Sequence, residues 1–182
     1  MLARSAYHEA GHAVVALALG LPIKKVTIEP TETLRGSVSL DLADDDAPEE
    51  SLTPAQRVKL GIVELSWALA GPLAEEIALG EADAGSRRDY RDADQAVERT
   101  DATMGTLPWQ WRHWAATRVE SYLRQNWDLV ERLAVALLMQ RTMTGTRVLE
   151  IVGGVPPLDT AAVQKGIEYW SGVMAARAKA SA

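Results

Sequence analysis

The chain has 182 residues, 47% of them apolar, which is enough to bury a full core as one domain with or without a small appendage. A net charge of −6 and a pI of about 5.1 exclude a basic surface for nucleic acid. Cysteine is absent, so disulfides and thiolate metal sites are excluded, and any metal ion must be bound by histidine or carboxylate side chains.

The longest apolar stretch, residues 13–23, is too short to span a bilayer. It also lacks the charged start and the cleavage site of a secretory signal, so we expect a soluble cytoplasmic protein with no membrane span. The stretch continues a predicted helix that begins at Arg4 or Ser5 and ends before Gly20. Because this helix is apolar on almost every side, we expect it to be buried.

This first helix carries the sequence His8-Glu9-Ala10-Gly11-His12. With 3.6 residues per turn, His8 and His12 lie on one face and can bind a single zinc ion. Glu9 lies about 60° around the helix from His12, where it can act as general base for a zinc-bound water. The pattern also occurs by chance, and the two histidines are then ordinary helix residues. Burying them without a metal or a partner would cost several kcal/mol, which favours zinc.

Two short strands are predicted next, over residues 23–30 and 36–40, because β-branched residues occur there on either side of a turn. Together they indicate a small hairpin. Residues 41–50 form an acidic loop that we expect to be solvated.

A strong helix start follows, with Thr53 as N-cap, Pro54 at the first helical position and Gln56 completing a capping box. We expect this helix to kink or restart at Pro72, because proline cannot donate the backbone hydrogen bond of a helix interior. We expect Gly80 to end the helical segment that follows Pro72. Further helices are predicted over residues 86–104, 108–125, 127–142, 145–151 and 160–178. The predicted fold class is mainly α with one small sheet.

A catalytic zinc site usually has three protein ligands, so a third must come from elsewhere in the chain. His113 is the only other histidine, but it lies among three tryptophans, which is more typical of a packing or surface residue than of a ligand. The remaining candidates are carboxylates. Spacing alone does not choose among Glu75, Glu76, Asp83, Asp89, Asp92 and Asp94.

Five segments of the chain carry a family resemblance: residues 6–15, 25–30, 69–76, 85–93 and 129–138. Taken in this order, they resemble the peptidase domain of the FtsH family, the ATP-dependent zinc proteases of bacterial and organellar membranes. Each segment alone is a weak signal, whereas the ordered set is specific.

The resemblance implies an FtsH-like zinc metallopeptidase domain over residues 1–152. Residues 153–182 have no counterpart in the family, and we expect them to form a C-terminal helical extension packed on the same domain. The resemblance also implies Asp89 as the third zinc ligand beside His8 and His12, and Glu75 as the acceptor of a hydrogen bond from a ligand imidazole. Two alternatives remain open. In the first, Asp89 is only the capping-box partner of Ser86. In the second, Glu75 is only a surface glutamate.

The implied function is that of a zinc metalloendopeptidase that hydrolyses peptides or unfolded proteins, with Glu9 as general base. An extended substrate is expected to pair with an exposed strand, at residues 26–28 or 36–40. A different class of answer is a non-catalytic, zinc-stabilised module for interaction or regulation.

The sequence also departs from that family. It contains no Gly-x-x-x-x-Gly-Lys-Ser/Thr sequence, so the ATPase module is absent from these residues, and any activity of this chain alone is expected to be independent of ATP. A separate ATPase chain is therefore a candidate partner. Family members form hexamers to which the ATPase ring contributes, so the sequence leaves open whether this chain forms a homo-oligomer.

Overall fold

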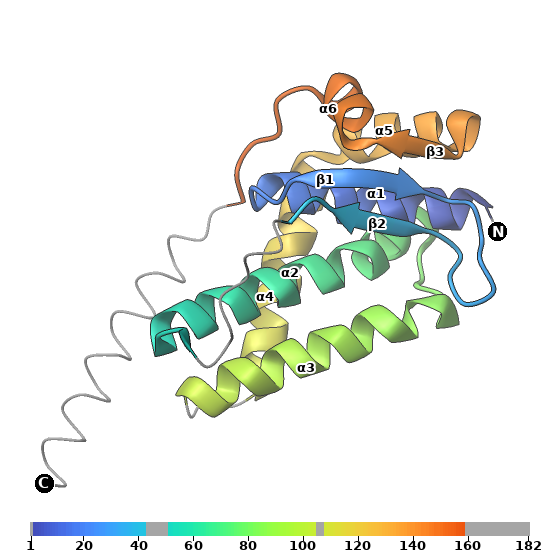
Figure 1. Ribbon diagram of the computed structural model, residues 1–182. Helices are drawn as coiled ribbons and strands as arrows, with labels where there is room; N and C mark the ends of the chain where they lie inside the picture. Colours follow the sequence, from blue (N-terminus) through green and yellow to red (C-terminus); the bar gives the residue numbers. More distant parts are fainter. Residues whose placement is uncertain (1, 43–50, 105–107, 159–182) are drawn as a thin grey trace, which may run out of the picture.

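The computed structural model describes residues 2–42, 51–104 and 108–158 (Figure 1). These residues form six α-helices and one three-stranded antiparallel sheet, in the order α1, β1, β2, α2, α3, α4, α5, β3 and α6. The predicted mainly helical fold class with a small sheet near the first helix is confirmed. The acidic residues 43–50 and the helix expected over residues 160–178 lie outside the described residues.

The first helix, α1 (Leu2–Ala18), is buried along most of its length, as its composition predicts. It begins two residues before the earliest predicted start. Its apolar side chains pack mainly against the second and fifth helices. The fully or almost fully buried ones are Ala6, Ala10, Ala13, Val14, Val15, Ala16 and Ala18.

The predicted hairpin is present and gains a third strand. Strand β1 (Ile23–Thr27) pairs antiparallel with β2 (Ser37–Leu40), and Val26 lies opposite Val38. On its other side, β1 pairs antiparallel with β3 (Thr142–Thr144), and Val26 lies opposite Met143. The sheet order is therefore β2-β1-β3, with β1 in the centre. The third strand was not predicted, because three residues between two helices carry no period-2 pattern.

The second helix, α2 (Pro54–Leu79), begins with the predicted cap. The side chain of Thr53 accepts a hydrogen bond from the backbone N–H of Gln56, and the Gln56 side chain accepts one from the backbone N–H of Thr53. The expectation of a restart at Pro72 is wrong, because α2 is one continuous helix with Pro72 in its interior. Burial against α1 and two later helices stabilises this part of α2 enough to tolerate the missing backbone hydrogen bond.

The remaining helices follow the predicted boundaries closely. A short 3₁₀ turn, η2 (Ala84–Ser86), leads into α3 (Arg87–Met104), and α4 (Pro108–Gln125) and α5 (Trp127–Gln140) come next. The last described helix is α6 (Gly145–Val152). Beyond it, the backbone N–H of Leu158 donates to the carbonyl oxygen of Ala18. The proposed boundary at residue 152 stays a prediction.

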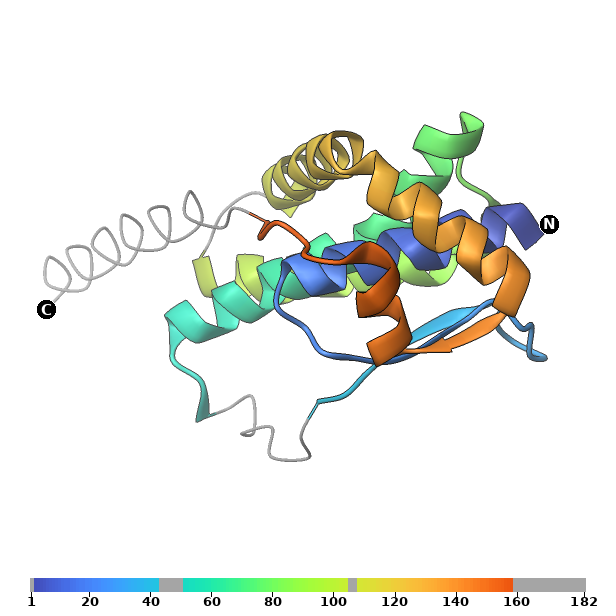
Figure 2. The same ribbon diagram turned by 90° about the horizontal axis from the view of Figure 1, so that it is seen from above.

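The helices are arranged so that α1 and α3 reach the same stretch of α2. Figure 1 shows α2 between α1 and α3, and the contacts between these helices agree with that view. Seen from above in Figure 2, the sheet lies along one side of α1 and α5 crosses α1. Among the described helices, none is long and apolar enough to cross a membrane. This packing brings residues from the start and from the middle of the chain to one place.

Candidate metal centre

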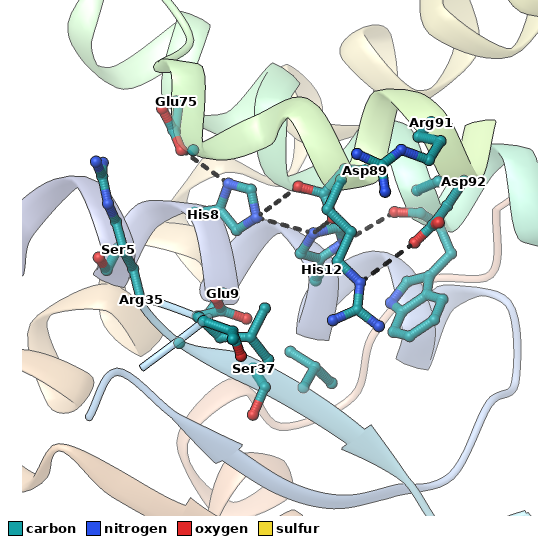
Figure 3. A pocket seen from close by; sticks show the side chains of 18 of the residues that line it. Ser5, His8, Glu9, His12, Arg35, Ser37, Glu75, Asp89, Arg91 and Asp92 are labelled. Atoms are coloured by element: carbon teal, nitrogen blue, oxygen red, sulfur yellow. Dashed lines mark hydrogen bonds and ion pairs between the residues drawn. The ribbon is translucent and has the colours of Figure 1, made fainter. Parts of the chain in front are cut away.

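The two histidines of α1 face the same point. Their Nε2 atoms are 3.1 Å apart, and their ring centroids are 4.7 Å apart (Figure 3). His12 is buried and His8 is nearly so, with 13% of its side chain exposed. This is the convergence that the i, i+4 spacing predicts.

Close packing of α2 defines the other side of this point. A Cβ atom at Gly71 would lie only 2.4 Å from Nε2 of His12 and 2.7 Å from Nε2 of His8. Only glycine therefore lets α2 pass this near to the imidazoles without filling the space at their Nε2 atoms.

The third side chain comes from the first turn of α3. One carboxylate oxygen of Asp89 lies 3.1 Å from Nε2 of His8, and the other lies 3.5 Å from Nε2 of His12. Among the described residues, His8, His12 and Asp89 are the one group of histidines and acidic residues whose ligand atoms converge, all within 4.8 Å of one another. Ser86, the residue considered above as the capping-box partner of Asp89, donates from its hydroxyl to Oε1 of Glu75 at 3.4 Å.

Each of the two imidazoles is held in place by a hydrogen bond through its Nδ1 atom. His8 donates from Nδ1 to Oε1 of Glu75 at 2.8 Å, and His12 donates from Nδ1 to the backbone carbonyl oxygen of Trp67 at 2.9 Å. Because a carbonyl oxygen only accepts, the His12 proton must be on Nδ1, which leaves Nε2 available as a ligand. This is the arrangement that usually accompanies a metal-binding histidine.

Glu75 is itself firmly held, although it lies far from α1 in sequence. Its Oε2 accepts hydrogen bonds from the Arg4 guanidinium and from the backbone N–H of Asp83, each at 2.9 Å. Only 4% of Glu75 is exposed. Burial opposes its ionisation, but the contacts with His8 and Arg4 lower its pKa overall. Glu75 is therefore a buried carboxylate at the centre of a network, not a surface glutamate.

The electrostatics of the cluster favour positive charge. Burial lowers the pKa of His8, but the hydrogen bonds that its ring donates to Asp89 and Glu75 outweigh burial and raise it to about 10. For Asp89, burial is opposed by His12 and His8, which hold the pKa of its carboxyl well below the usual range. A divalent cation meets the same requirement, and two imidazoles with one carboxylate are a typical ligand set for catalytic zinc. The residues present therefore fit a zinc ion.

Glu9 lies beside the cluster, not within it. It is 5% exposed, and in Figure 3 it lies on the side of the imidazoles that faces Ser37. Burial raises its pKa, which makes it a stronger base than an exposed glutamate. A cavity of about 880 Å³ adjoins all of these side chains and is lined also by the start of β2 and by one face of α3.

The structure thus brings together the five side chains singled out from the sequence and leaves His113 out. His113 is exposed on α4 and is not part of the convergent group. Sequence reasoning missed the roles of the Trp67 carbonyl, Gly71 and Arg4. A backbone carbonyl carries no residue signature, and the need for glycine at position 71 follows only from the crossing of α1 and α2.

Comparison with known proteins places this chain in a class of peptidases. The model of a family described as "Peptidase family M41" matches residues 3–106, which is more than half of the chain. The matched range includes the five side chains singled out above: His8, Glu9, His12, Glu75 and Asp89. The chain belongs to peptidase family M41.

Three relatives illustrate the match, and each is named ATP-dependent zinc metalloprotease FtsH. The protein of Kosmotoga olearia is 37% identical over 102 residues, 55% of this chain and 15% of its own length. That of Opitutus terrae is 34% identical over 106 residues, 57% of this chain and 16% of its own. That of Leptotrichia buccalis is 27% identical over 200 residues, 90% of this chain and 24% of its own. The chain therefore spans a quarter or less of the length of these relatives.

Proposed function

We propose that this chain binds zinc through His8, His12 and Asp89 and hydrolyses peptide bonds of peptides or unfolded proteins. The observation that carries the proposal is the convergence of three ligand atoms from two helices within 4.8 Å, with a buried glutamate beside them. Family membership and the printed names of the relatives support the same conclusion.

Each side chain has a distinct part in the proposed reaction. Bound zinc supplies Lewis-acid activation of water and of the scissile carbonyl. Glu9 takes the proton of the attacking water on its carboxylate and passes it to the departing amine. Glu75 and the Trp67 carbonyl keep the imidazoles of His8 and His12 in the tautomer and orientation that present Nε2.

The sheet narrows the choice of strand for a substrate. Of the two segments expected from the sequence, residues 26–28 belong to or directly follow β1, which is paired on both sides, so they offer no free edge. Strand β2 is at the edge of the sheet among the described strands, and Ser37 and Val38 line the cavity. An extended peptide adding to β2 would run past the metal centre.

The decisive variant is Glu9→Gln, which keeps the size of the side chain and one acceptor oxygen but removes the base. We expect zinc content equal to that of the wild type by elemental analysis and a loss of hydrolysis of fluorescently labelled casein by at least about 100-fold. A zinc chelator should abolish wild-type cleavage to the same extent.

Two results would count against the proposal. Unchanged turnover by Glu9→Gln would remove Glu9 from the role of general base. Zinc-loaded wild-type protein that cleaves neither casein nor a peptide library would favour the interaction module instead. Supply of unfolded substrate by a separate ATPase chain is a further part of the proposal, tested by adding that chain to the casein assay.

A further inference from the structure

Arg35 lies on the loop between β1 and β2, next to the proposed active site. Its half-exposed side chain forms an ion pair with Asp83, which lies in the segment between α2 and η2. The guanidinium also lies against the following turn, since a Cβ atom at Gly85 would be 3.3 Å from Nη1 of Arg35. Figure 3 shows Arg35 at the edge of the cavity, beside Glu9 and Ser37. One side chain thus joins the hairpin loop to the helical part of the molecule.

Asp83, the partner of Arg35 in this ion pair, also supports the proposed metal centre. The backbone N–H of Asp83 donates to Oε2 of Glu75 at 2.9 Å, and Oε1 of Glu75 accepts from His8. The segment around Asp83 is therefore fixed relative to His8. A loop attached to Asp83 is fixed relative to the same side chain.

The next residue, Gly36, shows what this attachment positions. A Cβ atom at Gly36 would lie 2.6 Å from Oε1 and 2.8 Å from Cγ of Glu9, so the backbone at Gly36 covers the carboxylate. Strand β2 begins one residue later, at Ser37. The turn before Arg35 closes on itself, with the Thr31 N–H donating to the Leu34 carbonyl oxygen at 2.7 Å. These turn hydrogen bonds do not attach the loop to the helices.

We propose that Arg35 is a positioning residue whose ion pair with Asp83 holds the β1–β2 loop in place, so that Gly36 covers Glu9 and the start of β2 lies beside the metal centre. The expected effect of Arg35 on catalysis rests on the proposed peptidase function, whereas its expected effect on the order of the loop does not. An exposed ion pair contributes little to global stability, so Arg35 acts on the local equilibrium of the loop.

The test compares Arg35→Ala and Asp83→Ala with the charge-swapped double variant Arg35→Asp/Asp83→Arg. Arg147→Ala is the matched control, because Arg147 pairs with Glu150 on α6, away from the cavity, at 2.7 Å. Amide hydrogen exchange of residues 31–40 in the zinc-loaded protein reports loop opening without any activity measurement. Each single variant should exchange faster, by up to about fivefold, and the swap should restore most of the protection.

Kinetics with a fluorogenic peptide provide the second readout. We expect Arg35→Ala to raise KM by up to about fivefold at unchanged zinc content, because β2 must be ordered before a peptide can pair with it. A purely structural loss would instead lower the active fraction, and so kcat, without changing KM. Arg147→Ala should change neither KM nor exchange.

Unchanged exchange of residues 31–40 in Arg35→Ala would overturn the positioning role, as would a charge swap no better than the single variants. If Asp83→Ala does not fold, Arg35→Gln and Arg35→Ala still decide by exchange. Absence of hydrolysis by the wild type would refute the proposed function alone, because the exchange experiment would still test the loop.

Discussion

The space beside Gly71 offers a direct test of where the metal ion binds. In Gly71→Ala, the new methyl group would start 2.4 Å from Nε2 of His12, whereas ordinary van der Waals contact begins at 3.4 Å. Relief of this overlap requires the imidazole or α2 to move by about 1.0 Å, several times the roughly 0.2 Å tolerance of zinc ligand distances. We therefore expect zinc affinity to fall by at least about 100-fold, more than is usual for residues that only support a ligand.

The fold should survive this substitution. Overpacking a core costs about 1–3 kcal/mol, and alanine in place of glycine within a helix returns about 1 kcal/mol, so the metal-free protein should lose at most about 2 kcal/mol of unfolding free energy. Urea unfolding in the presence of a chelator measures this loss, and competition with a chromophoric chelator measures zinc affinity. Gly154→Ala is the control, because nothing lies within 4 Å of a Cβ atom there. Zinc affinity of Gly71→Ala within threefold of the wild type would refute the proposed position of the metal ion.

Three further predictions concern the ligands and the zinc ion. Asp89→Ala should retain no zinc after gel filtration by elemental analysis, since one of three ligands is lost, and equal metal content would assign the third ligand elsewhere. Glu75→Gln should weaken zinc binding by about 10–100-fold in chelator competition, because the charged acceptor for His8 is lost, and an unchanged affinity would make the 2.8 Å contact incidental. Zinc at 100 times its Kd should stabilise the wild type by about 2.7 kcal/mol, raising Tm by roughly 5–10 °C in calorimetry. The same shift in Asp89→Ala would show that zinc binds at another site.

Local periodicity was sufficient for the part of the centre that lies on one helix. His8, Glu9 and His12 are placed by the helical repeat alone, and the buried character of α1 follows from its composition. Asp89 is different, because spacing left six carboxylates equivalent. Only the resemblance to a known family singled it out, since its approach to His8 depends on how α3 packs against α2.

The failures have the same origin in tertiary packing. Proline at position 72 indicates a helix break by its backbone chemistry, yet α2 continues because its surroundings bury it on several sides. Strand β3 has no signal of its own and exists because β1, more than a hundred residues earlier, presents an edge to it. Local rules cannot describe an element whose stability lies in a distant partner.

The central position of β1 has a consequence for any attempt to shorten the protein. Residues 3–106 contain every side chain of the proposed centre, and they are also the part that matches the family model. A chain ending at residue 106 would lack β3, however, and would leave β1 with an unpaired row of backbone N–H and C=O groups on the side that faces away from β2. It would also lose α5, which covers the apolar face of α1. Such a fragment would carry the full set of proposed metal ligands on a scaffold prone to edge-to-edge aggregation.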